Sequence, residues 1–324
     1  RCPGHLPDYG ATIMKPDIRV GVTPALDLWS RPWEERKKAL QRVVDFGIDH
    51  VFFADHVSFR FGHGHDGMVS AAALANLHPE IGIYLGVYLL PLRHPVPVAR
   101  QLANLAEMAP GRISFGIGVG GDDRHEVEVC GVDPRTRGQR TDESLEIVQG
   151  LLRGETLSYS GKFFEIDRAR IVPVPKPAIP VYVGGRADAA LRRAGKFADG
   201  WLGIWCSPER YREALNIFDE AANEAKRTIT PDHGIQLWVG IGDSKDDAAG
   251  CVGPEMENFY QVPFEKFSKY TPHGTVDDVV EFLTPYLEAG CRHFNLTPCA
   301  VSTEKATEAI GLVGERLRAL DGKS

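Results

Sequence analysis

The sequence of 324 residues predicts an α/β fold, specifically a TIM (β/α)8 barrel with insertions. Short β-branched and aromatic runs alternate with segments of helical period along nearly the whole chain, and eight such runs can be counted. Eight β/α units close into a parallel barrel whose functional residues lie at the C-terminal ends of the strands. A doubly wound open sheet is the alternative. Its first strand should lead into G-x-G-x-x-G, and Gly21-Val22-Thr23-Pro24 is not that motif.

The expected strands and helices follow this alternation in order. The strands are expected at 18–25, 48–54, 81–90, 112–119, 181–183, 200–205, 235–241 and 292–297. The helices are expected at 34–46, 70–77, 95–109, 141–152, 188–197, 208–226, 276–289 and 303–320, with a less regular helical region over 245–270. Residues 154–177 have the alternation and the Ser160-Gly161 turn of a β-hairpin, so they form a small insertion after strand four. We expect one barrel domain over 18–324, with 1–17 as an N-terminal extension.

Composition narrows the class of protein. The chain is 43% hydrophobic and 25% charged, as in an ordinary globular protein, and its net charge of -7 argues against non-specific nucleic-acid binding. No apolar run approaches the roughly 18 residues that a transmembrane helix needs. The six cysteines are scattered without a C-x-x-C pair. We therefore expect a cytoplasmic protein with free thiols and a small-molecule partner, and no nucleic-acid or membrane partner.

Polar side chains follow the second strand. Asp55-His56 stands directly at its end, where an imidazole could exchange a proton with a ligand, although such pairs also cap helices. The next segment, FRFGHGHDG over 59–67, contains His63 and His65. Their H-x-H spacing suggests a metal, but no carboxylate or cysteine cluster completes a ligand set. We expect no metal here, and a mobile, aromatic, histidine-bearing lid over the barrel mouth.

Glycines mark three other strand ends. Gly86 interrupts the third strand, as a bulge or a close approach requires, and the fourth strand ends in a glycine-rich run over 116–121. Gly184-Gly185-Arg186 leads directly into a helix, so its backbone N–H groups and its arginine suit a phosphate. Thr275, after Gly274, either adds a second anion contact or is an N-cap. Arg93-His94 either orients a substrate or pairs with nearby carboxylates.

Five motifs in this order resemble the bacterial luciferase-like family, and more narrowly its branch that uses the deazaflavin coenzyme F-420. They are Ala54-Asp55-His56-Val57, Leu90-Pro91-Leu92-Arg93-His94-Pro95, Gly111 to Gly118 (GRISFGIG), Val181-Tyr182-Val183-Gly184-Gly185 and Ala198-Asp199-Gly200-Trp201. The matching segments run from about residue 20 to residue 297, which is most of the chain.

The resemblance implies where the cofactor lies. Its ring would sit at the C-terminal mouth of the barrel against a bulge in strand three, which often contains a non-proline cis peptide bond. By position we predict this bond between Val87 and Tyr88. The residues implied in cofactor binding are Gly86, Val87 and Tyr88 at the bulge, Gly118, Val119 and Gly120 beside the ring, and Gly184, Gly185 and Arg186 at the phosphate. Asp55 and His56 match the pair near the reactive carbon.

The implied function is hydride transfer between coenzyme F-420 and a small organic substrate, with His56 as proton donor or ring-polarising group. One departure concerns Gly121, where the sugar-phosphate dehydrogenases of this branch carry a glutamate, so oxidation of a sugar phosphate is disfavoured. The alternatives are an FMN-dependent monooxygenase that uses oxygen, a non-catalytic flavin-binding protein and a metal-dependent barrel hydrolase. The family resemblance also implies a homodimer. Segments 59–67 and 251–270 are expected to shape the substrate pocket.

Overall fold

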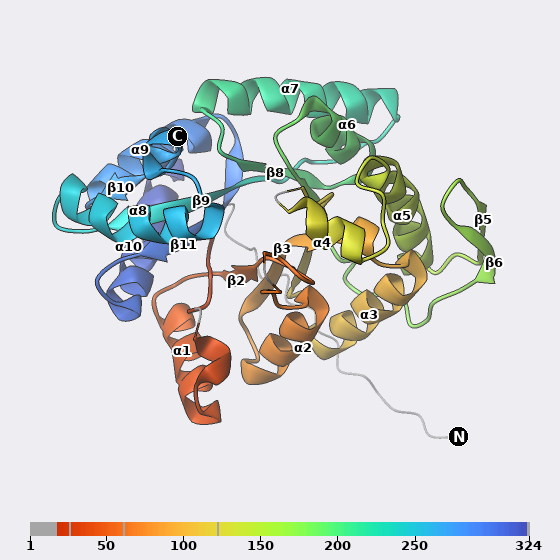
Figure 1. Cartoon of the computed structure of the whole chain (residues 1–324), viewed down its shortest axis with the longest axis horizontal. Helices are drawn as coiled ribbons and strands as arrows, with labels where there is room; N and C mark the ends of the chain where they lie inside the picture. The colour runs from red at the N-terminus through yellow and green to blue at the C-terminus, as the bar shows by residue number, and fades with distance from the viewer. Residues whose placement is uncertain (1–17, 26, 61, 122, 323–324) are drawn as a thin grey trace.

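The fold is a closed parallel β-barrel surrounded by helices, which confirms the predicted TIM barrel (Figure 1). The computed structural model describes residues 18–25, 27–60, 62–121 and 123–322, and the predicted extension over 1–17 lies outside them. The barrel strands follow one another as β9-β11-β1-β2-β3-β4-β7-β8, and β8 pairs back to β9 to close the ring. Every barrel pairing is parallel.

Strands and helices alternate much as the sequence predicts. The barrel strands are β1 (Arg19–Val22), β2 (His50–Phe53), β3 (Gly82–Leu89), β4 (Ile113–Gly118), β7 (Val181–Gly184), β8 (Gly200–Ile204), β9 (His233–Ile241) and β11 (Cys291–Cys299). The helices are α1 (Trp33–Asp45), α2 (Gly67–Leu77), α3 (Pro95–Met108), α4 (Arg124–Val129), α5 (Arg137–Leu152), α6 (Asp188–Phe197), α7 (Pro208–Glu224), α8 (Lys245–Tyr260), α9 (Val276–Glu288) and α10 (Thr303–Asp321). Among the described residues, no helix is long and apolar enough to span a bilayer.

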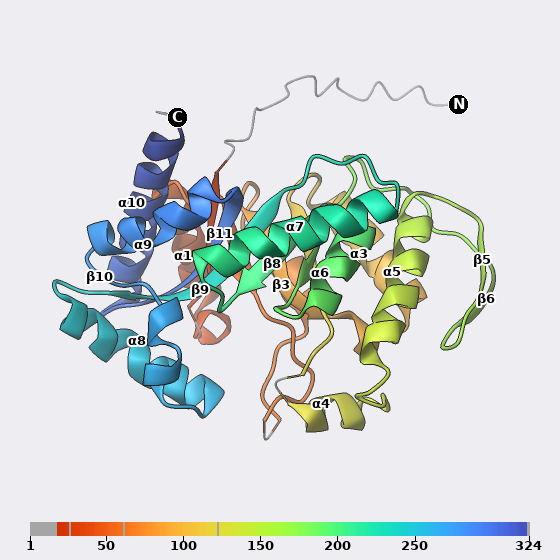
Figure 2. The ribbon, with the colours of Figure 1, turned by 90° about the horizontal axis from the view of Figure 1, so that it is seen from above.

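The insertions differ in part from expectation. The predicted hairpin is confirmed as the antiparallel pair β5 (Leu157–Ser160) and β6 (Glu165–Ala169), which projects from the barrel beside α5 (Figure 2). Four of the described elements were not predicted: α4, the short 3-10 helices Leu28–Ser30 and Leu90–Leu92, and the two-residue strand β10 (His273–Gly274), which pairs with β9. The irregular region over 245–270 resolves into α8 and two short 3-10 helices.

The barrel interior is polar near the N-terminal ends of its strands. At the N-terminal end of the strands, the Asp232 carboxylate accepts a hydrogen bond from the Tyr182 hydroxyl at 3.0 Å and contacts His293 Nε2 at 2.6 Å and the Arg19 guanidinium. Burial raises the pKa of Asp232, but the hydrogen bond from His293 and the charges of His293 and Arg19 outweigh it and leave the pKa below its ordinary value. A cavity of about 160 Å³ lies at this end, lined in part by Arg19 and Tyr84.

His233, at the start of β9, makes stability depend on pH. Its Nδ1 accepts a hydrogen bond from the Trp201 backbone N–H at 3.1 Å, and burial lowers its pKa from 6.5 to about 4. Because the unfolded chain takes up this proton near pH 6.5 and the folded chain only near pH 4, acidification through this window lowers the free energy of unfolding by up to about 3 kcal/mol.

In His233→Asn this contribution disappears, so denaturant unfolding at a series of pH values should give a flatter dependence of the free energy of unfolding on pH than wild type. The exposed His125→Asn is the control and should keep the wild-type slope; equal slopes for all three proteins would contradict the prediction.

Candidate active site

The candidate site lies at the C-terminal end of the barrel, where the predicted site residues follow their strands. Figure 2 shows α4 and α8 extending beyond the barrel on one side, with the loop between β2 and α2 descending between them. The small inner residue Ala54 is exposed at this end, and Val87 and Gly184 are half-buried. The cavity beside Tyr84 lies at the opposite end, so it does not belong to this site.

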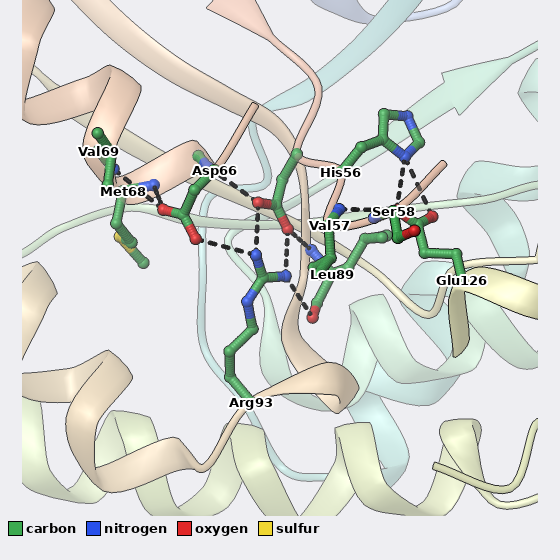
Figure 3. A network of polar contacts seen from close by, with 11 residues as sticks. His56, Val57, Ser58, Asp66, Met68, Val69, Leu89, Arg93 and Glu126 are labelled. Atoms are coloured by element: carbon green, nitrogen blue, oxygen red, sulfur yellow. Dashed lines mark hydrogen bonds and ion pairs between the residues drawn. The ribbon is translucent and has the colours of Figure 1, made fainter. Parts of the chain in front are cut away.

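Asp55 is a buried anchor that ties β2 to its neighbours. Its side chain is 1% exposed, and its carboxylate accepts hydrogen bonds from the backbone N–H groups of Gly67 at 2.8 Å and Leu89 at 2.9 Å. The Arg93 guanidinium binds both carboxylate oxygens, at 2.5 and 2.8 Å, and also reaches Asp66 at 3.1 Å (Figure 3). Burial raises the pKa of Asp55, and the Arg93 charge opposes this rise. Arg93 thus pairs with carboxylates, the second of the two roles considered for it.

His56 is held by a buried glutamate that the sequence analysis did not assign. The Glu126 side chain, on α4, is 3% exposed, and its Oε1 accepts hydrogen bonds from the backbone N–H groups of Val57 at 2.7 Å and Ser58 at 3.2 Å. His56 Nδ1 lies 3.1 Å from Glu126 Oε2 (Figure 3). The face of the imidazole ring stacks against the Phe59 ring, and the two ring centroids are 4.1 Å apart.

This geometry determines the tautomer of His56. A carboxylate only accepts hydrogen bonds, so Nδ1 carries the hydrogen and donates it to Glu126. The other ring nitrogen, Nε2, points away from Glu126 (Figure 3). It is therefore the atom of His56 that accepts a proton when the ring is neutral and donates one when the ring is charged.

The predicted bulge in strand three is present, but its cis peptide bond lies one residue earlier than predicted. The bond joins Gly86 and Val87, not Val87 and Tyr88. In the pairing with β4, Leu85 faces Phe115 and Tyr88 already faces Ile117, so two residues of β3 oppose one of β4. Regular pairing resumes at Tyr88, which leaves the irregular bond inside the bulge.

The bulge turns the Val87 side chain into the barrel, and two predicted glycines make room for it. A Cβ atom on Gly118 would stand 2.5 Å from Val87 Cγ2, and one on Gly184 would stand 2.8 Å from Val87 Cγ1. These glycines are thus required by the packing of Val87. Tyr88 lies differently, because its ring is buried in the outer layer against Phe115 and beneath the Arg93 guanidinium.

The remaining predicted residues lie in two turns at the same end. Val119 and Gly120 follow β4 and are half-buried, and Gly120 has a φ of 71° that favours glycine. Gly185 has a φ of 135°, and its carbonyl accepts a hydrogen bond from Trp201 Nε1 at 2.7 Å. Arg186 is exposed, with its guanidinium 5.2 Å from the Trp205 ring centroid.

Helix α6 begins directly after this turn without a side-chain cap. Its N-cap, Ala187, has no side-chain acceptor for the first backbone N–H groups. By contrast, Thr275 forms a full capping box with Asp278 at the start of α9, so it is an N-cap. In the described part of the chain, no group of three histidine, cysteine or acidic residues is placed to hold a metal ion.

Comparison with known proteins identifies the family. The profile of a family described as luciferase-like monooxygenase matches residues 20–278. The chain belongs to this family. An uncharacterised protein of Mycobacterium tuberculosis is 36% identical over 160 residues, which cover 49% of this chain and 55% of the relative. The chain thus aligns with about half the length of that relative.

Two further relatives carry functional names. A protein of Nakamurella multipartita named F420-dependent glucose-6-phosphate dehydrogenase is 27% identical, covering 86% of this chain and 91% of the relative. A 4-hydroxyprotoasukamycin monooxygenase of Streptomyces nodosus is also 27% identical, covering 74% of this chain and 66% of the relative. An F420-dependent secondary alcohol dehydrogenase, solved with an F420-acetone adduct, shares the fold with a TM-score of 0.76 at 20% identity, covering 91% of this chain and 98% of that one.

The packing of Val87 gives a direct test by mutation. Gly118→Ala places a methyl group against Val87, so we expect it to lower the free energy of unfolding by about 1–3 kcal/mol. Val87→Ala in the same chain should relieve this clash, so the double variant loses less stability than the sum of the two single variants. Gly250→Ala is the control, because a Cβ there meets no atom within 4 Å and helix α8 favours alanine. Additive losses in a denaturant double-mutant cycle would refute the packing argument.

Proposed function

We propose that this chain is an oxidoreductase that binds the deazaflavin coenzyme F-420 and exchanges a hydride between it and a small organic substrate. The observation that carries the proposal is that two features share one end of the barrel. One is His56, held by the buried carboxylate of Glu126. The other is the turn Gly184-Gly185-Arg186, which opens into the uncapped helix α6. The F420-dependent names of the relatives support the choice of cofactor.

The residues at the mouth fit a flat cofactor with a phosphate-bearing chain. Ala54 and the half-buried face of Val87 leave a surface of small apolar groups for a ring. The uncapped start of α6, its positive dipole end and the exposed Arg186 suit a phosphate, and the Asp188 carboxylate in the same turn is paired with Arg210 at 2.5 Å. When bound, a deazaflavin supplies two-electron hydride chemistry. Gly86, Gly118, Val119 and Gly120 border the proposed ring site through their backbone.

The protein's own residues then handle the proton. His56 Nε2 takes up a proton from the substrate hydroxyl during oxidation, or returns it to the carbonyl oxygen during reduction. Glu126 keeps the ring oriented through Nδ1. We assign Asp55 a positioning role, because its carboxylate is fully engaged by Arg93 and by two backbone N–H groups.

Two features of the setting complete the proposal. The five described cysteines are all free, as is usual in a reducing compartment, and we propose a cytoplasmic location. From the luciferase-like resemblance we propose a homodimer.

The second candidate function is an FMN-dependent monooxygenase, which the monooxygenase relative of Streptomyces nodosus favours.

Titration with the two cofactors tests the choice between them. We expect oxidised coenzyme F-420 to bind, followed by its fluorescence, and FMN to bind far more weakly. Arg186→Ala should weaken cofactor binding about tenfold, because it removes a charged contact to phosphate. Arg192→Ala, on the same helix but paired with Glu224 at 3.8 Å, is the control and should bind as wild type. Tight FMN binding without deazaflavin binding would overturn the proposal in favour of the monooxygenase.

Substitutions of the proposed proton donor and its partner test the mechanism. His56→Gln should lower kcat about 10²–10⁴-fold while the cofactor Kd stays unchanged. Glu126→Gln keeps an oxygen that accepts the two loop N–H groups but removes the charge, so we expect a smaller loss of about tenfold in kcat. Glu128→Gln is the control, since Glu128 is an exposed residue of the same helix that pairs with Arg124. Wild-type turnover in His56→Gln would remove the proton-transfer role.

A further inference from the structure

Six aromatic side chains form a continuous wall along one side of the barrel mouth. The aromatic wall consists of Phe59, Trp205, Trp238, Phe259, Tyr260 and Phe267. Neighbouring rings of the wall are in contact, and their centroids are 4.7 to 5.9 Å apart. The Trp238 indole N–H also donates to the Tyr260 hydroxyl at 3.1 Å. The residues come from four parts of the chain that meet only in the fold: the β2–α2 loop, the end of β8, the inner face of β9, and α8 with the segment after it.

The wall adjoins the proposed proton donor. Phe59 stacks on the His56 imidazole at 4.1 Å on one side and on Phe259 at 5.6 Å on the other. Trp238 belongs to the inner face of β9, because its neighbours Leu237 and Val239 are fully buried on the outer face. A substrate that reaches His56 therefore meets aromatic surface on this side.

The rings are packed without being fully covered. Phe59 is buried, whereas the other five members of the aromatic wall are half-buried. Such surfaces bind flat apolar groups, because burying apolar area is worth roughly 25 cal/mol per Å² and stacked rings add about 0.5–1.5 kcal/mol.

Two arginines border the wall, and Arg60 keeps one buried guanidinium nitrogen, Nη1, without a hydrogen-bond partner among the described residues. The Arg60 guanidinium lies 5.2 Å from the Phe59 ring centroid and donates through Nη2 to the Tyr260 carbonyl at 3.0 Å. Arg186 lies over Trp205 beside the turn assigned above to the cofactor phosphate. On the other side of His56, Glu126 adds a buried carboxylate. Beside the aromatic faces, a dianionic phosphate monoester would find the single unpaired donor of Arg60 and the Arg186 already assigned to the cofactor phosphate, which are fewer donors than a dianion needs.

We propose that the aromatic wall is the substrate subsite and that it takes an uncharged organic molecule with a flat ring, not a sugar phosphate. The inference rests on the proposed function, because it places the substrate against the wall with its reacting group at His56 Nε2.

Isothermal titration calorimetry with defined probes tests the subsite without relying on turnover. The probes are acetophenone and 2-acetylnaphthalene as uncharged aromatic ketones, and glucose 6-phosphate as the competing class. Each is titrated into the full chain, with and without oxidised coenzyme F-420. We expect at least one ketone to bind and glucose 6-phosphate to leave its isotherm unchanged. Glucose 6-phosphate displacing the ketone, or neither ketone binding up to its solubility limit, overturns the proposal.

Variants of the wall locate the binding. Trp238→Leu should raise the ketone Kd at least about fivefold, because it removes a stacking surface. The control is Trp33→Leu on α1, whose tryptophan is 51% exposed and lies outside the wall; its ketone Kd should match wild type. Phe259→Leu serves as a second wall variant should Trp238→Leu fail to fold, and the same rise is expected. A Kd within twofold of wild type in a folded wall variant overturns the proposal.

The two proposals fail in different ways. Ketone binding that depends on the wall in a protein that binds no deazaflavin would leave the subsite standing and remove the proposed cofactor. If deazaflavin binds but the ketone Kd is unchanged in Trp238→Leu and Phe259→Leu, the proposed cofactor stands and the subsite is refuted.

Discussion

The buried carboxylate of Asp55 is the constraint on which the mouth of the barrel depends. A charged group that is 1% exposed needs partners, and here these are the Arg93 guanidinium and the backbone N–H groups of Gly67 and Leu89. These contacts join the end of β2 to the start of α2 and the end of β3. The next residue in the chain is His56, so the anchor also determines where the imidazole begins. Glu126 then sets its rotation from the opposite side of the loop.

Packing supplies the second constraint, because the bulge of β3 needs space inside the barrel. Two residues of β3 oppose one of β4, and this extra length turns Val87 inward. Its isopropyl group fits only where its neighbours on β4 and β7 lack a Cβ atom, at Gly118 and Gly184. The same glycines leave the adjoining backbone without side chains, so the packing of Val87 also supplies the bare backbone on which the proposed cofactor site depends.

The barrel and the turn before α6 were predictable because their signals are local. Strand and helix periods are visible within ten residues, and Gly184-Gly185-Arg186 is contiguous. The partner of His56 was not predictable in this way, since Glu126 lies 70 residues away in a short acidic helix that resembles an ordinary exposed one. The cis bond was misplaced by one residue, because the register of β3 against β4 depends on Val87 fitting two distant glycines. The aromatic wall was equally hidden, apart from the expectation that 59–67 and 251–270 shape the pocket.

These constraints divide the mouth into two chemically different sides. Toward β3, α2 and α4, charges are buried and each has a fixed partner, as Asp55 has Arg93 and Glu126 has His56. Toward β8, β9 and α8, the surface is aromatic, with a hydrogen bond between Trp238 and Tyr260 and with the guanidinium groups of Arg60 and Arg186 at its border. In the proposed function, fixed charges orient the proton donor at no reorganisation cost during reaction, and the aromatic wall selects the substrate by shape. Substitution on the aromatic side would therefore change which molecule is bound, and substitution on the charged side would change how well its proton is moved.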